Sequence, residues 1–166
     1  MADKIGVVAF AFGVPSTIES NERISEIASA IARELKAKGV YTQTDVVIEK
    51  GIAVWQIEEK SGSKPPPTLR IAREAVRWAN LFDLNKLYVV AAKPHYWRAV
   101  RDLKRAVRER KAKIEVCQVS RINQYPEGSW FCSDSTQERT QSRTNWEKRE
   151  RILRHTPFWI YKLIAS

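Results

Sequence analysis

Apolar runs typical of buried strands alternate along this chain with segments whose apolar residues recur every three or four positions. Residues 4–12 are almost continuously apolar and rich in valine and phenylalanine, which predicts a strand covered on both faces. An amphipathic helix is expected next, because five apolar residues follow at helical spacing before Gly39: Ile24, Ile27, Ala28, Ile31 and Leu35. Alternation of this kind is the pattern of an α/β fold.

The alternation continues as far as residue 120. Two short apolar segments, 45–49 and 52–58, are separated by Gly51 and are expected to form either a hairpin or one interrupted strand. Four further elements are expected after a proline-rich loop: a helix from Thr68, a strand over 86–92, a helix over 95–111 and a strand over 113–120. We therefore expect one three-layer, Rossmann-like α/β domain over residues 1–166, built on a mainly parallel sheet of about five strands.

The order of these elements predicts how the sheet is assembled. Three segments are expected to be neighbouring parallel strands, namely 5–12, 86–92 and 113–119, with helices over 20–38 and 95–111 covering the sheet. Residues 122–145 carry polar and turn residues and predict a long loop. A final helix, interrupted near Pro157, is expected to close the chain.

The chain is strongly basic, with 29 Lys and Arg against 19 Asp and Glu and a formal net charge of +10. Such a charge favours an acidic partner: a nucleotide, a nucleic acid, an acidic protein or an anionic membrane.

The two cysteines of the chain, Cys117 and Cys132, suit a reducing compartment. The amino-terminal apolar run lacks the features of a secretory signal, and no stretch approaches the roughly 20 apolar residues of a membrane span. We therefore expect a cytoplasmic location.

The sequence VVAAKPHYWRAV, residues 89–100, places basic side chains where a strand passes into a helix. Ligands of parallel sheets bind beyond the carboxyl ends of the strands, and His95 and Arg98 share one face of the helix start. The N–H groups of a first helical turn and an arginine fork both suit a phosphate or a carboxylate. His95 is the candidate catalytic residue, because imidazole donates a hydrogen bond or moves a proton near neutral pH. The simpler alternative is that His95 caps or packs the helix start and Arg98 is solvated.

The same stretch resembles the signature of the ElyC/SanA/YdcF family, in which a strand end is followed by His-x-x-Arg-Ala, here His95, Arg98 and Ala99. Two earlier junctions are similar to this family as well. The segment FGVPSTIESNERI is similar to its first strand end at Gly13, Pro15, Ser16 and Arg23. The segment QIEEKSGSKPPPTLRIAREA is similar to its acidic strand end, serine-containing loop and helix start at Glu59, Ser61 and Thr68. The segment NWEKRERILRH is loosely similar to its closing helix.

The resemblance implies a Rossmann-like fold with a cleft at these junctions for an anionic, nucleotide-like small molecule. The implied ligand-binding residues are Gly13, Ser16, Arg23, Glu59, Thr68, Lys93, His95 and Arg98. The chain departs from the family pattern, because it has no Ser-Gly-Gly triplet and has Ala91 and Ala92 where the family has a threonine-serine pair. A hydroxyl that could bind an anion or attack a substrate is therefore missing there, and the resemblance supplies neither a reaction nor a cofactor.

A shared site requires Gly13, Arg23, Thr68, His95 and Arg98 to converge on one cleft. Simpler roles compete with this prediction: Gly13 as a turn, Thr68 as an N-cap and Arg23 as a solvated charge. Glu58 and Glu59 are adjacent on a predicted strand, so at most one of them points into a site. With two histidines, and cysteines 15 residues apart, the sequence has no metal-ligand spacing, and we expect no structural zinc.

The basic helix supports an alternative function, nucleic-acid binding. From Lys93 to Lys113 there are nine Lys or Arg against two acidic residues. One face carries a stripe of arginines that could follow a phosphate backbone: Arg98, Arg101, Arg105 and Arg108. Trp130 and Phe131, in the predicted loop, could stack on unpaired bases, or Trp130 could cover Cys132 or the sheet edge. A third possibility is an interaction module that uses the same arginines on an acidic protein.

Overall fold

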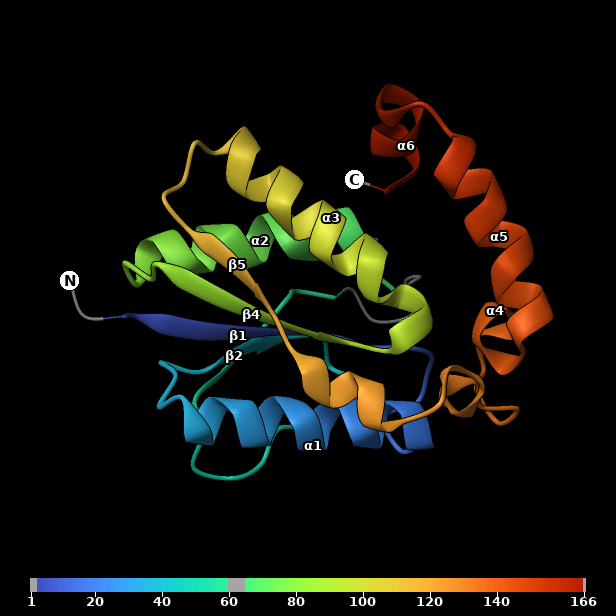
Figure 1. Ribbon diagram of the computed structural model, residues 1–166, viewed down its shortest axis with the longest axis horizontal. Helices are drawn as coiled ribbons and strands as arrows, with labels where there is room; N and C mark the ends of the chain where they lie inside the picture. The colour runs from blue at the N-terminus through green and yellow to red at the C-terminus, as the bar shows by residue number, and fades with distance from the viewer. Residues whose placement is uncertain (1–2, 60–64, 166) are drawn as a thin grey trace.

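Five parallel strands form the centre of the protein, whose computed structural model describes residues 3–59 and 65–165 (Figure 1). The strands are β1 (Ile5–Phe10), β2 (Val40–Thr42), β3 (Val54–Gln56), β4 (Lys86–Ala91) and β5 (Glu115–Gln118). Their order across the sheet is β3-β2-β1-β4-β5. β1 pairs with β4 in register from Ile5↔Lys86 to Phe10↔Ala91, and β4 pairs with β5. The predicted α/β fold and the predicted parallel neighbours are therefore confirmed.

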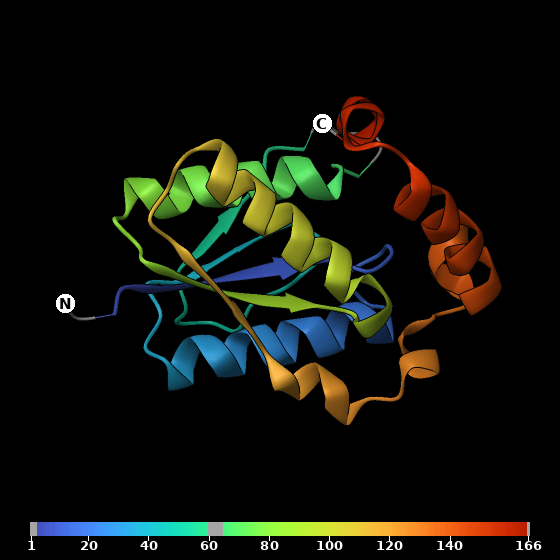
Figure 2. The same ribbon diagram turned by 45° about the horizontal axis from the view of Figure 1, so that its top comes forward.

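Helices cover both faces of the sheet, which explains why its central strands are apolar throughout. The helix α1 (Glu19–Glu34) lies on one face, and α2 (Thr68–Leu81) and α3 (Lys93–Glu109) lie on the other (Figures 1 and 2). Successive side chains of a strand point to opposite faces. Accordingly, Val7 and Ala9 belong to the core beneath α1, whereas Val8 and Phe10 belong to the core beneath α2 and α3. The result is the three-layer, Rossmann-like arrangement.

The edge of the sheet beyond β1 differs from the prediction. Residues 45–49 do not form a strand, and β2 and β3 run parallel, pairing Val40↔Val54 and Thr42↔Gln56. Both the hairpin and the single interrupted strand are therefore wrong. The apolar residues of 45–49 have another role, because Val46 is fully buried in the α1 core and Ile48 packs against it from a loop.

The spacing of apolar residues predicts a helix that ends near Gly39, but α1 ends earlier. The helix stops at Glu34, and Lys36 takes the left-handed conformation that follows its last turn, with φ of 49°. At Gly39 a side chain would meet the Ala53 carbonyl oxygen at 2.3 Å. Glycine is therefore required there by the close approach of the β3 segment.

The predicted loop over 122–145 contains short helices. Two 3₁₀ helices, η1 (Ser120–Gln124) and η2 (Glu127–Trp130), are followed by α4 (Glu138–Gln141). The helix expected at the end of the chain is interrupted at Pro157, as predicted, and consists of α5 (Arg143–His155) and α6 (Phe158–Ala165). We call α5 and α6 the C-terminal arm. It lies at the end of the molecule toward which β1 and β4 point (Figure 2).

Both cysteines are free thiols. Among residues 3–59 and 65–165 no helix combines the length and the apolar character needed to cross a bilayer.

Candidate functional site

A pocket of about 350 Å³ opens at the carboxyl ends of the strands, and the C-terminal arm closes its far side. Its floor is formed by residues that follow β1 and β4, such as Phe12 and His95. The direction of strand order reverses between these two strands, which makes this the topological switch point of the sheet. Gln43, which follows β2, and Thr68, which starts α2, complete the side nearest the sheet.

His95 lies in the first turn of α3 and is almost fully buried. Its ring packs against Phe10, Phe12 and Trp146, with centroids 5.6 to 6.5 Å away. Burial, and next the Arg98 charge, lower the pKa of His95 well below its ordinary value, so the imidazole is neutral at physiological pH. The structure therefore favours a hydrogen-bonding role for His95 over proton transfer near neutral pH.

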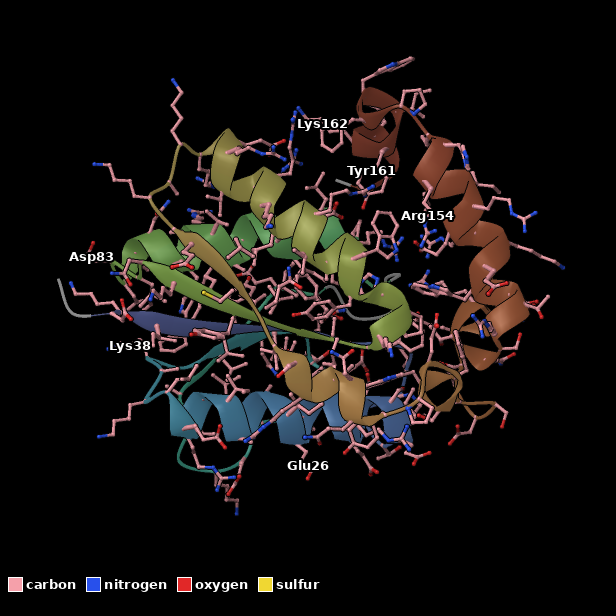
Figure 3. All side chains as sticks on the ribbon, in the orientation of Figure 1. Glu26, Lys38, Asp83, Arg154, Tyr161 and Lys162 are labelled. Carbon is pink, nitrogen blue, oxygen red and sulfur yellow. The ribbon has the colours of Figure 1, made fainter. Side chains whose placement is uncertain are left out.

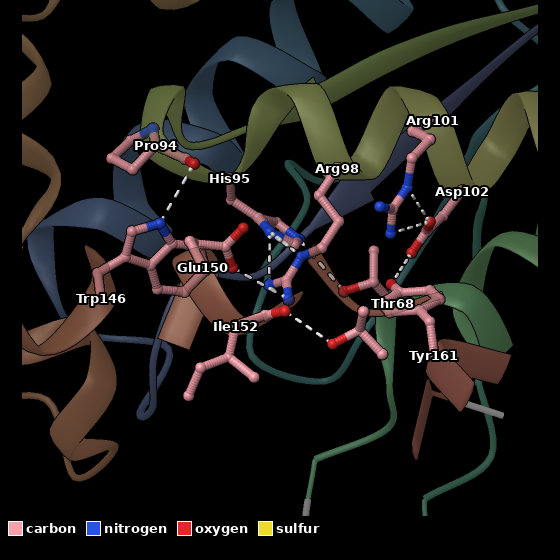
Figure 4. A network of polar contacts seen from close by, with 11 residues as sticks. Thr68, Pro94, His95, Arg98, Arg101, Asp102, Trp146, Glu150, Ile152 and Tyr161 are labelled. Atoms are coloured by element: carbon pink, nitrogen blue, oxygen red, sulfur yellow. Dashed lines mark hydrogen bonds and ion pairs between the residues drawn. The ribbon is translucent and has the colours of Figure 1, made fainter. Parts of the chain in front are cut away.

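The contacts of the His95 ring define which nitrogen carries the proton. The Nε of Arg98 donates to Nδ1 of His95 at 3.3 Å, which makes Nδ1 the acceptor (Figure 4). The proton of the neutral ring is consequently on Nε2, which lies 3.5 Å from the hydroxyl of Thr68. His95 thus presents a neutral N–H donor beside Thr68 at the pocket wall.

Arg98 is buried and forms an ion pair. The simpler alternative, in which Arg98 is solvated, is therefore wrong. Its Nη1 lies 3.1 Å from Oε1 of Glu150 on α5, and the side chains of Arg98 and Glu150 are only 5% and 6% exposed. Trp146 stacks over the guanidinium, with 5.2 Å between its ring centroid and Cζ. Burial raises the pKa of Glu150, while the Arg98 charge acts in the opposite direction. The pair ties the start of α3 to the C-terminal arm.

Two further arginines line the pocket from the opposite side, Arg139 on α4 and Arg149 on α5. Both are partly buried, and within the described part of the chain neither forms a hydrogen bond or an ion pair. Burial, followed by repulsion from Arg149 and Arg98, lowers the pKa of Arg139 to about 10. Burial and the Arg98 charge also lower the pKa of Arg149. Both groups nevertheless remain charged at neutral pH.

A second set of contacts attaches the arm to α3. Tyr161 of α6 donates a hydrogen bond from its hydroxyl to Oδ2 of Asp102, whose Oδ1 accepts from Arg101 Nε at 3.0 Å (Figure 4). Tyr161 and Arg154 both point toward α3 (Figure 3), and the Arg154 guanidinium lies 4.9 Å from the Trp97 ring. These contacts hold the arm over the pocket.

Four of the five residues expected to share a cleft line this pocket, namely Gly13, Thr68, His95 and Arg98. Gly13 has a φ of 103°, which glycine adopts without strain. Thr68 is not the N-cap, because Pro67 occupies that position and Thr68 is the first helical residue.

Arg23 is the fifth residue, and it lies away from the pocket lining. Its guanidinium donates to the carbonyl oxygen of Ser129 and stacks 4.6 Å from the Tyr125 ring centroid, because η2 packs over that turn of α1. It is neither a pocket residue nor a solvated charge.

The remaining residues implied by the resemblance do not line the pocket either. Ser16 is partly buried, Lys93 is exposed, and the Glu59 carboxylate accepts from the Thr44 amide at 3.5 Å. Ser61 lies outside the described residues.

The arm covers part of the arginine stripe of α3. Arg101 lies between Asp102 and the Tyr161 ring, and Arg105 stacks on Phe158 at 4.2 Å. Arg108 is exposed, and the Arg105 side chain keeps 42% of its surface exposed. Trp130, a candidate for stacking on bases, is fully buried. Its ring lies in the core beneath α1 and packs against the Tyr125 ring, with 5.5 Å between the centroids.

Sequence reasoning missed the residues that the arm contributes. Trp146, Arg149, Glu150 and Leu153 are spaced i, i+3, i+4 and i+7 on α5, so they share one face of the helix. That spacing was a usable signal, because it combines two large apolar residues with two charges of opposite sign. Arg139 gave no such signal, since it lies in a four-residue helix within a polar segment.

Across residues 3–59 and 65–165, no group of three or more His, Cys, Asp and Glu is arranged to hold a metal ion. Comparison of the chain with protein-family models and with curated proteins gives no match. The similarity to the ElyC/SanA/YdcF family therefore stays a prediction.

Proposed function

We propose that the protein binds an anionic, nucleotide-like small molecule in the pocket at the carboxyl ends of the strands. The observation that carries this proposal is the pair of arginines, Arg139 and Arg149, that line the pocket without a partner in the described chain. Placing desolvated, mutually repelling cations in a pocket costs stability unless an anion compensates them. A ligand that carries negative charge removes that cost on binding.

The uncharged part of the pocket supports a ligand with an organic body. A volume of about 350 Å³ falls within the roughly 300–1,000 Å³ range of small-molecule sites. Phe12 and Trp146, which pack against each other, line the pocket beside the arginines and make part of its wall aromatic. The His95 N–H and the Thr68 hydroxyl add neutral hydrogen-bonding groups.

Nucleic-acid binding through α3 is the weaker candidate. Phosphate contacts need free cations along one face. Arg98, Arg101 and Arg105 instead contact Glu150, Asp102 and Phe158 within the chain. The exposed cations of the helix are Lys93, Lys104 and Arg108, and Lys93 lies at its first residue, far along the helix from the other two.

A thermal-shift measurement tests the proposal. The protein is heated with inorganic phosphate and with nucleoside mono- and diphosphates, in a buffer that contains neither phosphate nor sulfate. A ligand at a hundred times its Kd stabilises the folded state by about 2.7 kcal/mol. For a chain of this size the corresponding rise in Tm is roughly 5–10 °C. We expect at least one of these anions to produce it.

The variant Arg139→Gln/Arg149→Gln is expected to lose the rise, measured against the same variant without ligand. Each charged hydrogen bond contributes about 1.5–3 kcal/mol, so the two together change Kd by about a hundredfold or more. The control Lys104→Gln/Arg108→Gln removes the same charge from the outer face of α3 and should keep the rise. Oligonucleotide binding that disappears in the control variant, with no anion stabilising the parent, would contradict the proposal.

A further inference from the structure

The charges around the pocket do not balance. Arg98 is paired with Glu150 at 3.1 Å, and Arg101 is paired with Asp102 at 2.9 Å. Neither pair leaves a net charge. Arg139 and Arg149 remain, and within the described chain neither forms an ion pair. Glu150 attracts both, but burial and the repulsion from Arg98 act more strongly on each of them. The pocket therefore has an excess of two positive charges.

His95 adds a hydrogen-bond donor but no third charge. Burial, and next the Arg98 charge, lower the pKa of His95 and keep its ring neutral. The Arg98 guanidinium donates to Nδ1, which leaves the proton on Nε2. A protonated ring would place a third full charge within reach of Arg98, at 3.1 Å from its Nη2. His95 therefore adds no third charge to the excess at neutral pH.

We propose that the pocket selects a dianionic phosphate group, the terminal group of a phosphomonoester, over monoanions such as carboxylates and phosphodiesters. The inference rests on the proposed function and names the class of ligand that the site accepts. A phosphomonoester carries close to two negative charges at neutral pH and three terminal oxygens. Two guanidinium forks and one neutral donor, supplied by Arg139, Arg149 and the His95–Thr68 pair, match that set of acceptors.

A monoanion leaves one of the two guanidiniums uncompensated. Removing water from the pocket strengthens the repulsion between the remaining charge and Arg98, because the effective dielectric constant falls. A diester also replaces one charged oxygen with an ester oxygen, which is a poorer acceptor. The energetic difference between the two ligands thus comes from the second charge and not from size or shape.

The test compares pairs of probes that differ by one charge. Methyl phosphate is compared with dimethyl phosphate, and adenosine 5′-monophosphate with adenosine 3′,5′-cyclic monophosphate, at constant ionic strength. Binding is followed by calorimetry and by nitrogen-15 NMR. We expect the dianion of each pair to bind at least about tenfold more tightly than the monoanion.

Arg149→Gln lowers the charge excess to one and should bring the ratio within each pair to about two or less. Arg151→Gln is the matched control, because Arg151 is exposed on the same helix two positions further along. It should leave the ratio of the parent protein intact. A variant that lost binding through misfolding would lose both probes of a pair together, and its NMR spectrum would show it.

The pH dependence provides a second readout. The second pKa of a phosphomonoester is about 6, so methyl phosphate should bind roughly tenfold more weakly at pH 5 than at neutral pH. The charged and titratable groups that face the site are His95, Arg98, Asp102, Arg139, Arg149, Glu150 and Tyr161. Dimethyl phosphate has no such pKa, so its pH profile isolates any contribution from these protein groups.

The outcomes separate this inference from the proposed function. Equal affinity for methyl phosphate and dimethyl phosphate would overturn the selection of a dianion and leave anion binding in place. Binding of neither probe, and of neither adenosine nucleotide, would overturn both.

Discussion

Replacing Arg139 should stabilise the protein in the absence of ligand, although Arg139 is proposed to bind one. The pKa of Arg139 is lowered to about 10, whereas a solvated guanidinium has a pKa above about 12. At about 1.4 kcal/mol per pKa unit, the difference amounts to about 3 kcal/mol. This is the cost of burying the Arg139 charge near Arg149 and Arg98.

The sign follows from the direction of the change in pKa. Because the folded value lies below the unfolded value, the cost is fully present at neutral pH and is relieved only as the pH rises past about 10. Glutamine at position 139 keeps part of the aliphatic chain and removes the charge. After loss of some packing, we expect Arg139→Gln to increase the free energy of unfolding by about 1–2 kcal/mol, or roughly 3–6 °C in Tm.

The assay is urea unfolding followed by circular dichroism at pH 7, in a buffer free of phosphate and sulfate. Arg151→Gln is the control, since Arg151 is exposed, and its stability should match that of the parent. A loss of more than about 1 kcal/mol in Arg139→Gln would refute the reasoning, because it would show that Arg139 makes a stabilising contact.

Three other substitutions have defined outcomes. His95→Gln should abolish a pH dependence: the folded pKa of His95 lies below the unfolded value, so the parent loses stability as the pH falls below about 6.5, by about 1.4 kcal/mol per pH unit. Urea unfolding between about pH 7.5 and 5 measures this pH dependence. If the free energy of unfolding fell equally with pH in the parent and in His95→Gln, that result would contradict a neutral buried ring. Gly13→Ala should cost about 2–4 kcal/mol, because φ is 103° and the new Cβ would lie 2.7 Å from Ile18 Cδ1. An unchanged Tm would show that this turn rearranges freely. Tyr161→Phe should cost about 1–3 kcal/mol, because Asp102 loses a buried donor, and unaltered urea unfolding would mean that this contact does not hold the arm.

The centre of the fold could be predicted from sequence because its strands are buried on both faces. β1 and β4 are almost entirely apolar, and α1 to α3 show apolar residues at helical spacing. β2 and β3 have three residues each, which is too short for a periodic signal. The more apolar segment beside them, 45–49, was mistaken for a strand because burial alone does not distinguish a packed loop from a sheet.

The candidate site could be predicted only where it follows strand ends. His95 and Arg98 lie directly after β4, so the position of the strand locates them. Arg139 and Arg149 reach the same pocket from segments more than 40 residues further along, and their positions depend on how α4 and the arm pack against the rest of the fold. Charged residues in a polar segment are usually solvated, so sequence alone favours the wrong environment for both.

The central claim is that an anion binds between the strand ends and the C-terminal arm, and a nitrogen-15 NMR titration with methyl phosphate tests it most directly. The predicted result is a saturable set of shifts at the backbone amides of Thr68, His95, Arg139 and Arg149, all of which line the pocket. These shifts should be absent in Arg139→Gln/Arg149→Gln. Shifts confined to the outer face of α3, around Lys104 and Arg108, or no saturable shifts at all, would contradict the claim.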